Sequence, residues 1–166
     1  KRTGTAARTR DATRASDNQP PNFDALVREG LDCHDRAEKK KNDNPTFAIQ
    51  MFRNALEKYE QAEKMITSEE QSSVELSFNM GVAYSGLASV FRNMETRNSA
   101  DQADEYHLLA CQCYSHVVKM DPTNAEALNN WGSALSTFAE GRKDPLEAVG
   151  LLQQACDKLE QALSIA

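Results

Sequence analysis

The sequence has few residues that break regular structure and lacks the features of several large protein classes. It contains 7 glycines and 5 prolines in 166 residues, too few for an all-β protein with many tight turns. No apolar run approaches the roughly 18 residues that a membrane-spanning helix needs. Its 4 cysteines do not make a disulfide framework in a chain of this length. The glycines are scattered, without the spacing of a phosphate-binding loop or a nucleophile elbow. We therefore expect no membrane span, no enzymatic activity and no cofactor.

The composition that remains is typical of an acidic, helical, folded protein. Hydrophobic residues make up 40% of the chain and charged residues 27%, which excludes a wholly disordered protein. The net charge of −6 argues against a general nucleic-acid binder. This charge is unevenly divided, because five basic and two acidic residues give residues 1–21 a charge of +3 and leave −9 for the rest. The two parts are expected to meet different surroundings.

Residues 1–21 form a basic segment rich in Arg, Ser, Thr and Ala. This composition predicts a disordered tail, a remnant of an organelle transit segment, or a partner-binding arm. The protein is expected to be intracellular, in a mitochondrion or plastid if the segment is a transit remnant and in the cytoplasm otherwise. The chain starts without methionine and stops at Ala166 within a helical pattern. Whether it continues past Ala166 stays open.

From Asn22 onward the apolar residues follow a helical period throughout, and capping residues divide the chain into six expected helices. Asn22 begins the first, and Asn44 with Pro45 begins the second. Ser68 and Ser99 each precede a glutamine three residues later, a capping-box pattern. The expected starts of the six helices are Asn22, Asn44, Ser68, Ser99, Thr123 and Asp144. The sequence thus predicts an all-α fold.

An internal repeat organises these helices into three pairs. Gly30, Gly81 and Gly132 each lie midway along the first helix of a pair and are 51 residues apart. Because a mid-helix glycine costs about 1 kcal/mol relative to alanine, its recurrence indicates close helix packing. Small residues also recur on the second helices, at Ala55, Ala110 and Ala155. We expect one domain over residues 22–166, with repeats at about 22–67, 68–122 and 123–166.

Several of these positions resemble the tetratricopeptide repeat (TPR) family. The family pattern is matched in the third pair by Leu128, Trp131-Gly132, Leu135, Ala155, Leu159 and Ala162, and by the stretch 121–127. The resemblance implies three antiparallel helix pairs stacked as a TPR-like right-handed α-solenoid. It also implies a non-enzymatic protein–protein interaction scaffold, as a subunit or assembly factor of a larger complex. The 51-residue spacing departs from the family's repeat of about 34, which implies lengthened helices.

Two other functions stay open. The third repeat is also similar to the plant mitochondrial import receptor of TPR type, around Trp131-Gly132 and in residues 158–163. That similarity implies an organelle protein-import receptor. Alternatively, the basic segment 1–21 would contact RNA in a ribonucleoprotein subunit whose repeats bind protein.

The resemblance places partner binding on the concave face, which the first helices line. The corresponding positions are Val27, Leu31, His34, Phe78, Val82, Ser85, Asn129 and Ser133. Among the positions of the family's chaperone-binding clamp only Asn79 matches, so we expect no such clamp. The apolar members instead predict a groove for a helix or an extended segment. The alternative is that the long helices close over this stripe and bury it as core.

Two further clusters carry predictions. The last helix has a wide apolar stripe that includes Leu151, Leu152 and Leu159, and we expect it to form an interface and to promote self-association. The only metal-like cluster is His107, Cys111, Cys113 and His116. Because residues two apart on a helix point in different directions, these four do not converge on a zinc ion. We interpret the thiols as buried and reduced and expect no metal.

Overall fold

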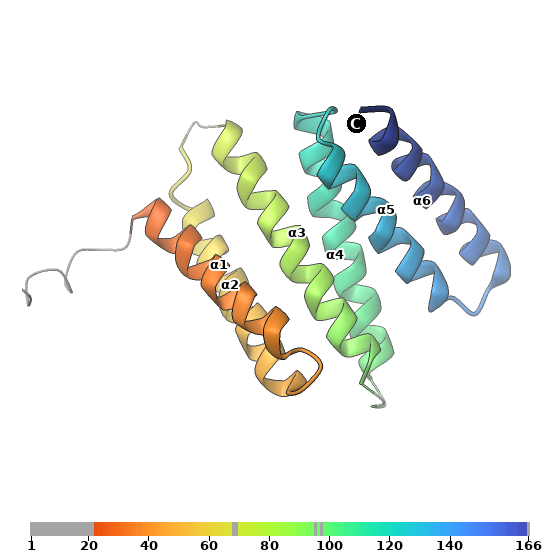
Figure 1. Ribbon diagram of the computed structural model, residues 1–166, viewed down its shortest axis with the longest axis horizontal. Coiled ribbons are helices and arrows are strands. Elements are labelled where there is room, and N and C mark those ends of the chain that lie inside the picture. Colours follow the sequence, from red (N-terminus) through yellow and green to blue (C-terminus); the bar gives the residue numbers. More distant parts are fainter. Residues whose placement is uncertain (1–21, 68–69, 95, 97, 166) are drawn as a thin grey trace, which may run out of the picture.

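The computed structural model describes residues 22–67, 70–94, 96 and 98–165, and the basic segment 1–21 lies outside them. Within this part of the chain the regular structure consists of six helices without a strand (Figure 1). They are α1 (Phe23–Lys40), α2 (Pro45–Glu63), α3 (Glu70–Arg92), α4 (Ser99–Met120), α5 (Ala125–Glu140) and α6 (Pro145–Ile165). The predicted all-α class is confirmed.

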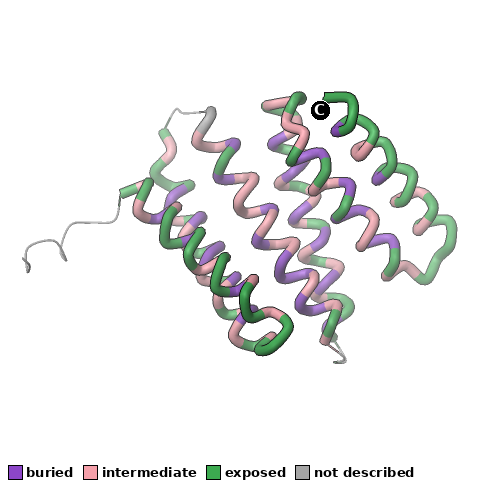
Figure 2. The backbone as a smooth tube through the Cα atoms, in the orientation of Figure 1, coloured by how far each residue is buried: buried purple, intermediate pink, exposed green. Residues whose placement is uncertain are grey.

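The helices form three antiparallel pairs that stand side by side in chain order (Figure 1). α1 packs on α2, α3 on α4, and α5 on α6, while α3 also contacts α2 and α5 also contacts α4. In the described residues, no close backbone contact joins the first pair to the third. Buried residues lie along α2, α3, α4 and α5, whereas most of α6 is exposed (Figure 2). The middle pair contributes residues to each of the three clusters of buried residues and is therefore the centre of the core.

The first two predicted helix starts are confirmed, because an asparagine side chain satisfies a free backbone N–H at each. The Asn22 side chain accepts a hydrogen bond from the Ala25 N–H at 2.8 Å. The Asn44 side chain accepts one from the Phe47 N–H at 3.1 Å. Both asparagines supply the side-chain oxygen that a helix N-terminus needs. The expected cap at Ser68 lies outside the described residues.

Two other predicted helix starts are wrong by one residue. α4 already begins at Ser99, so this residue is not its cap, and its hydroxyl donates back to the Thr96 carbonyl at 3.0 Å. α5 begins after Asn124, whose side chain accepts from the Ala127 N–H at 2.9 Å, rather than after Thr123. An asparagine adjacent to the predicted position provides the better acceptor in the second case.

At each of the three recurrent glycines, a large side chain of the second helix packs directly on the first helix. A Cβ atom at Gly81 would lie 2.8 Å from Cε1 of Tyr114, and one at Gly132 would lie 2.7 Å from Cγ of Leu159. A Cβ at Gly30 would overlap the Tyr59 ring in the same way. The residues that pack on the three glycines, which are Tyr59, Tyr114 and Leu159, therefore occupy equivalent positions on the second helices. On these helices Ala55, Ala110 and Ala155 are buried.

Candidate functional site

The residues predicted to line a concave groove are distributed over the first helices of the three pairs. Several of them make packing contacts with the second helices. The Phe78 ring meets the Tyr114 ring edge-on, with 6.1 Å between centroids, and the Ser85 hydroxyl lies 3.2 Å from the Tyr114 hydroxyl. The His34 ring packs edge-on against Phe52 at 5.5 Å. These side chains therefore hold the helix pairs together.

The other predicted groove residues vary in exposure along the stack. Val27 and Val82 are half-buried and pack against core clusters, while Leu31 is exposed. Asn129 and Ser133 on α5 are exposed and polar. The apolar stripe is thus interrupted along the first helices, and partner binding along it stays a prediction.

A different surface, which the sequence did not predict, forms an apolar groove between α4 and α6 with α5 as its floor. We call it the α4–α6 groove, and its volume is about 420 Å³. It is lined by Leu108, Cys111, Gln112 and Ser115 of α4, by Trp131, Leu135 and Phe138 of α5, and by Leu151 and Gln154 of α6. Leu108 on its rim is 50% exposed. The ammonium of Lys158 lies 4.4 Å from the centroid of the Trp131 ring, so one cation flanks an apolar floor.

The same location one pair earlier is filled by the protein's own aromatic rings. Tyr84 of α3 and Tyr106 of α4 stack with 6.2 Å between centroids, and Phe91 stacks on Tyr106 at 5.5 Å. These rings pack against the core cluster that includes α2. On the first helices, the 51-residue repeat aligns Leu135 of α5 with Tyr84 of α3. On the second helices, Tyr114 and Leu159 pack on equivalent glycines, which gives an offset of 45 residues. This offset aligns Leu151 of α6 with Tyr106 of α4. Two leucines therefore replace two tyrosines at the sides of the groove, while Trp131 and Phe138 on its floor replace Met80 and Leu87.

This pair of replacements is the signal that could have revealed the groove from the sequence. To find these replacements, one has to align the first helices by their 51-residue repeat and the second helices α4 and α6 by a spacing of 45 residues. The recurrence of Ala110 and Ala155 already gives that second spacing, and the residues that pack on the glycines agree with it.

The cysteines and histidines do not form a reactive centre in the structure. Burial raises the pKa of the Cys111 and Cys113 thiols to about 11, so both are protonated at neutral pH and are poor nucleophiles. His107 is buried and His116 is exposed. Across the described ranges, no three His, Cys, Asp or Glu side chains are placed to hold a metal ion.

The three leucines predicted to form an interface on the last helix point in different directions. Leu151 lines the α4–α6 groove, Leu159 packs on Gly132, and Leu152 is exposed. The sequence prediction omitted the more exposed apolar residues of the same helix, Leu146, Val149 and Leu163. α6 therefore has two separate apolar surfaces, one toward the groove and one toward solvent.

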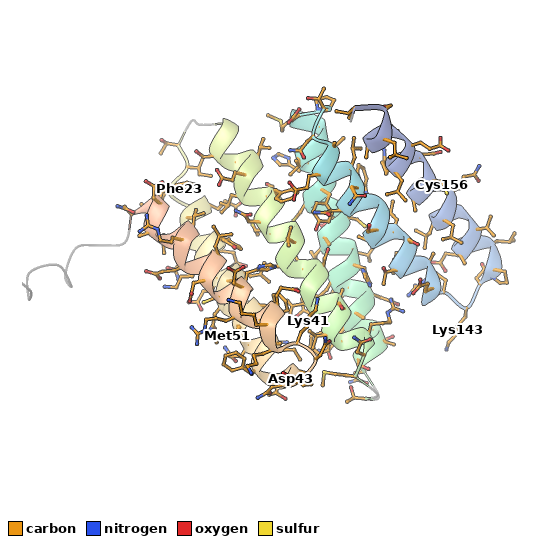
Figure 3. All side chains as sticks on the ribbon, viewed as in Figure 1. Phe23, Lys41, Asp43, Met51, Lys143 and Cys156 are labelled. Atoms are coloured by element: carbon orange, nitrogen blue, oxygen red, sulfur yellow. The ribbon has the colours of Figure 1, made fainter. Side chains whose placement is uncertain are left out.

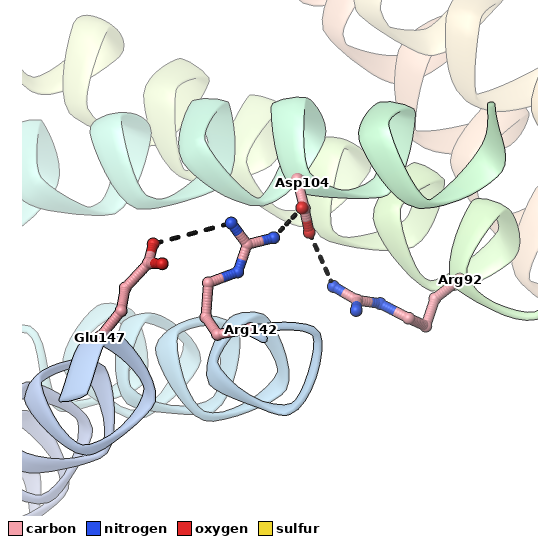
Figure 4. A network of polar contacts seen from close by, with 4 residues as sticks. All are labelled: Arg92, Asp104, Arg142 and Glu147. Atoms are coloured by element: carbon pink, nitrogen blue, oxygen red, sulfur yellow. Dashed lines mark hydrogen bonds and ion pairs between the residues drawn. The ribbon is translucent and has the colours of Figure 1, made fainter. Parts of the chain in front are cut away.

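A polar network fixes the loop between α5 and α6 to the middle pair (Figure 4). Asp104 of α4 pairs with Arg92 at 3.1 Å and also with Arg142. Arg142 in turn reaches Glu147 of α6 at 3.7 Å and stacks over Phe138 at 4.4 Å. Because Phe138 belongs to the groove floor, this network also sets the shape of the groove at one end.

Comparison of the chain with protein-family models, curated proteins and solved structures finds no match. Among the residues that the structure describes, no helix combines the length and the apolar character needed to cross a membrane.

Proposed function

We propose that this chain is a non-enzymatic protein-interaction scaffold whose α4–α6 groove receives a helix of another protein. The observation that carries the proposal is the open groove between the second and third pairs, whereas Tyr84 and Tyr106 stack on each other at the equivalent place between the first and second pairs. Grooves between packed helices commonly bind the apolar face of an amphipathic helix. The scaffold would act as a subunit or assembly factor of a larger complex.

The groove lining indicates what kind of partner helix would fit. Its floor carries two aromatic rings, Trp131 and Phe138, and its polar rim residues Gln112 and Gln154 are uncharged. Shape and apolar contact would therefore select the partner more than charge would. We expect the inserted side chains to be aromatic, because rings occupy the corresponding place one pair earlier.

The arrangement of the helices supports a TPR-like right-handed α-solenoid as the scaffold. Antiparallel pairs repeat in chain order, and in each pair a glycine of the first helix receives a large side chain of the second. Such arrays are built from neighbour contacts and expose long surfaces to partners. The lengthened repeat of 51 residues would widen each of these surfaces.

The test uses a variant that fills the groove from within. Leu151→Tyr restores a ring at the position that Tyr106 occupies in the preceding pair, and Met65→Tyr places the same ring at an exposed site that follows α2, outside both candidate binding surfaces. From a displayed library of amphipathic helices, we expect selected binders to carry aromatic residues at i, i+4 spacing. Their affinity should fall at least about tenfold for Leu151→Tyr, and Met65→Tyr should bind like the wild type.

A photoreactive residue at position 108 tests the same site with natural partners. We expect it to crosslink to another protein in an extract of the source cells, and the Leu151→Tyr substitution should abolish that crosslink. Labelling confined to the chain itself, or labelling that the filled groove leaves unchanged, would contradict the proposed function.

A further inference from the structure

Lys158 places a positive charge over the aromatic floor of the α4–α6 groove. Its ammonium lies 4.4 Å from the centroid of the Trp131 ring, and Trp131 belongs to the groove lining. On α6, Leu151, Gln154 and Lys158 follow one another by three and four residues, so their side chains lie on one side of the helix. Since Leu151 and Gln154 line the groove, Lys158 lies on its α6 side, one turn beyond Gln154.

The two cations on the groove floor differ in their partners. Arg142 stacks over Phe138 at 4.4 Å and pairs with the carboxylates of Asp104 and Glu147. Among the residues that the structure describes, no carboxylate forms an ion pair with Lys158. Its contact with Trp131 is a cation–π interaction, which does not neutralise the charge. Lys158 is thus a cation at the groove without an internal counter-charge.

The equivalent lysine of the first pair does have such a counter-charge. Tyr59 and Leu159 pack on equivalent glycines, so the residues that directly precede them, Lys58 and Lys158, are also equivalent. The ammonium of Lys58 pairs with the carboxylate of Glu29 at 2.6 Å. This ion pair also raises the pKa of Lys58. In the first pair the charge of the lysine is therefore balanced within the protein.

Trp131 stands where the first pair has this carboxylate. Glu29 and Trp131 each directly precede the recurrent glycine of their helix. The same two positions thus hold an ion pair in the first pair and a lysine above an aromatic ring in the third. In the middle pair they are occupied by Met80 and Cys113, which carry no charge. The third pair keeps the cation, lacks the carboxylate, and has these positions beside the open groove.

We propose that the helix bound in the α4–α6 groove presents an acidic side chain to Lys158, so that Lys158 sets the register of the partner. This inference rests on the proposed function and specifies the partner of the same site. Apolar contact with the floor supplies the affinity, and one charge pair at the edge fixes where along the groove the helix lies. The partner is an amphipathic helix with aromatic residues on its apolar face and a carboxylate at the edge of that face.

The spacing along α6 indicates where this carboxylate lies on the partner. Leu151, which aligns with a tyrosine of the middle pair, and Lys158 are seven residues apart, about 10 Å along the helix axis. A partner helix that runs along the groove covers the same distance in about two turns. We therefore expect an Asp or Glu about seven residues from the aromatic residue that packs beside Leu151.

The displayed helix library that tests the proposed function also tests this inference. Binders selected on the wild type should carry Asp or Glu about seven residues from an aromatic residue. Binders selected on Lys158→Glu should carry Lys or Arg at that place instead, because the charge they meet is reversed. The helical circular dichroism spectrum of this variant should be that of the wild type.

The affinity of one acidic binder measures the effect of the charge. Lys158→Met keeps an unbranched side chain over Trp131 and should weaken binding about fivefold at low salt, and less at high salt. Replacing the binder's carboxylate with its amide should give the same loss, and the two changes together should give no further loss. Lys143→Met is the matched control, because Lys143 is an exposed lysine in the loop between α5 and α6 (Figure 3), and it should bind like the wild type.

The outcomes separate this inference from the proposed function. Binders that Leu151→Tyr weakens, but that show no acidic preference or no response to Lys158→Met, would overturn the role of Lys158 and leave the groove as the binding site. Binders that Leu151→Tyr leaves unaffected, or a selection without binders, would overturn the proposed function and this inference with it.

Discussion

At the scale of single residues, the glycine of each first helix sets how closely the helices of a pair can approach. A Cβ atom at Gly81 would lie 2.8 Å from the Tyr114 ring and 3.1 Å from Cβ of Cys113, and the buried Tyr114 has little room to move. We expect Gly81→Ala to lower the free energy of unfolding by about 1–3 kcal/mol through overpacking. Gly150 provides the control, because a Cβ there meets nothing within 4 Å. Gly150→Ala should raise stability by about 1 kcal/mol. Urea unfolding of both variants measures the difference, and equal effects would contradict this packing role.

A second residue-scale prediction concerns the buried imidazole of His107. Neither ring nitrogen has a hydrogen-bond partner among the described residues. Burial, followed by the positive charge of Arg92, lowers the pKa of His107 to about 4 from the usual 6.5. The unfolded chain therefore takes up this proton at a higher pH than the folded protein. Above about pH 6.5, His107 is neutral in both states and its burial carries no protonation cost. As the pH falls from there toward about 4, protonation of the unfolded chain lowers the free energy of unfolding.

His107→Leu removes this titration while keeping an apolar side chain at the site. Between pH 7 and pH 5, the free energy of unfolding of the wild type should fall by about 2 kcal/mol more than that of the variant. Urea unfolding at the two pH values measures this difference. The carboxylates titrate in both proteins and cancel in the comparison. Equal losses in the two proteins would mean that His107 does not titrate as described.

At the scale of helices, the polar network links the first turn of α6 to the middle pair. The side chain of Arg142 is only 18% exposed and pairs with Asp104 and Glu147. We expect Arg142→Ala to cost about 1–3 kcal/mol, because it leaves Asp104 with one cation and uncovers Phe138. Arg36→Ala is the control, since the Arg36–Asp32 pair is exposed and should contribute less than about 1 kcal/mol. Hydrogen exchange should show faster exchange in α6 of the Arg142 variant only.

The helices were largely predictable from the sequence, whereas the groove was not. Capping chemistry is local, so Asn22 and Asn44 indicated where two helices begin. One error arose where a neighbouring asparagine supplied the cap instead of Thr123, and another where the Ser99 hydroxyl bonds to the preceding loop instead of capping α4. The α4–α6 groove instead depends on which side chains fill a space between helices that are distant in sequence. Leu135 and Leu151 look like ordinary core residues until the packing shows that tyrosines occupy the equivalent positions one pair earlier.

At the scale of the whole molecule, the described part of the chain behaves as a linear array of neighbours. The first and third pairs touch the second but not each other. In such an array, stability is a sum of the stability of each unit and of its contacts with adjacent units. A substitution that removes packing in one end pair should therefore lower the local stability of that pair more than the stability of the opposite end pair.

Two matched substitutions test this linear organisation. Leu26 of α1 and Leu128 of α5 are 2% and 1% exposed, and replacing either with alanine should cost about 2–5 kcal/mol. In native-state hydrogen exchange, Leu128→Ala should speed exchange in α5 and α6 more than in α1 and α2, and Leu26→Ala should do the reverse. Equal acceleration in both end pairs would show that the chain unfolds as one cooperative unit. Because the α4–α6 groove lies between the second and third pairs, a helix bound there should restore protection in Leu128→Ala but not in Leu26→Ala.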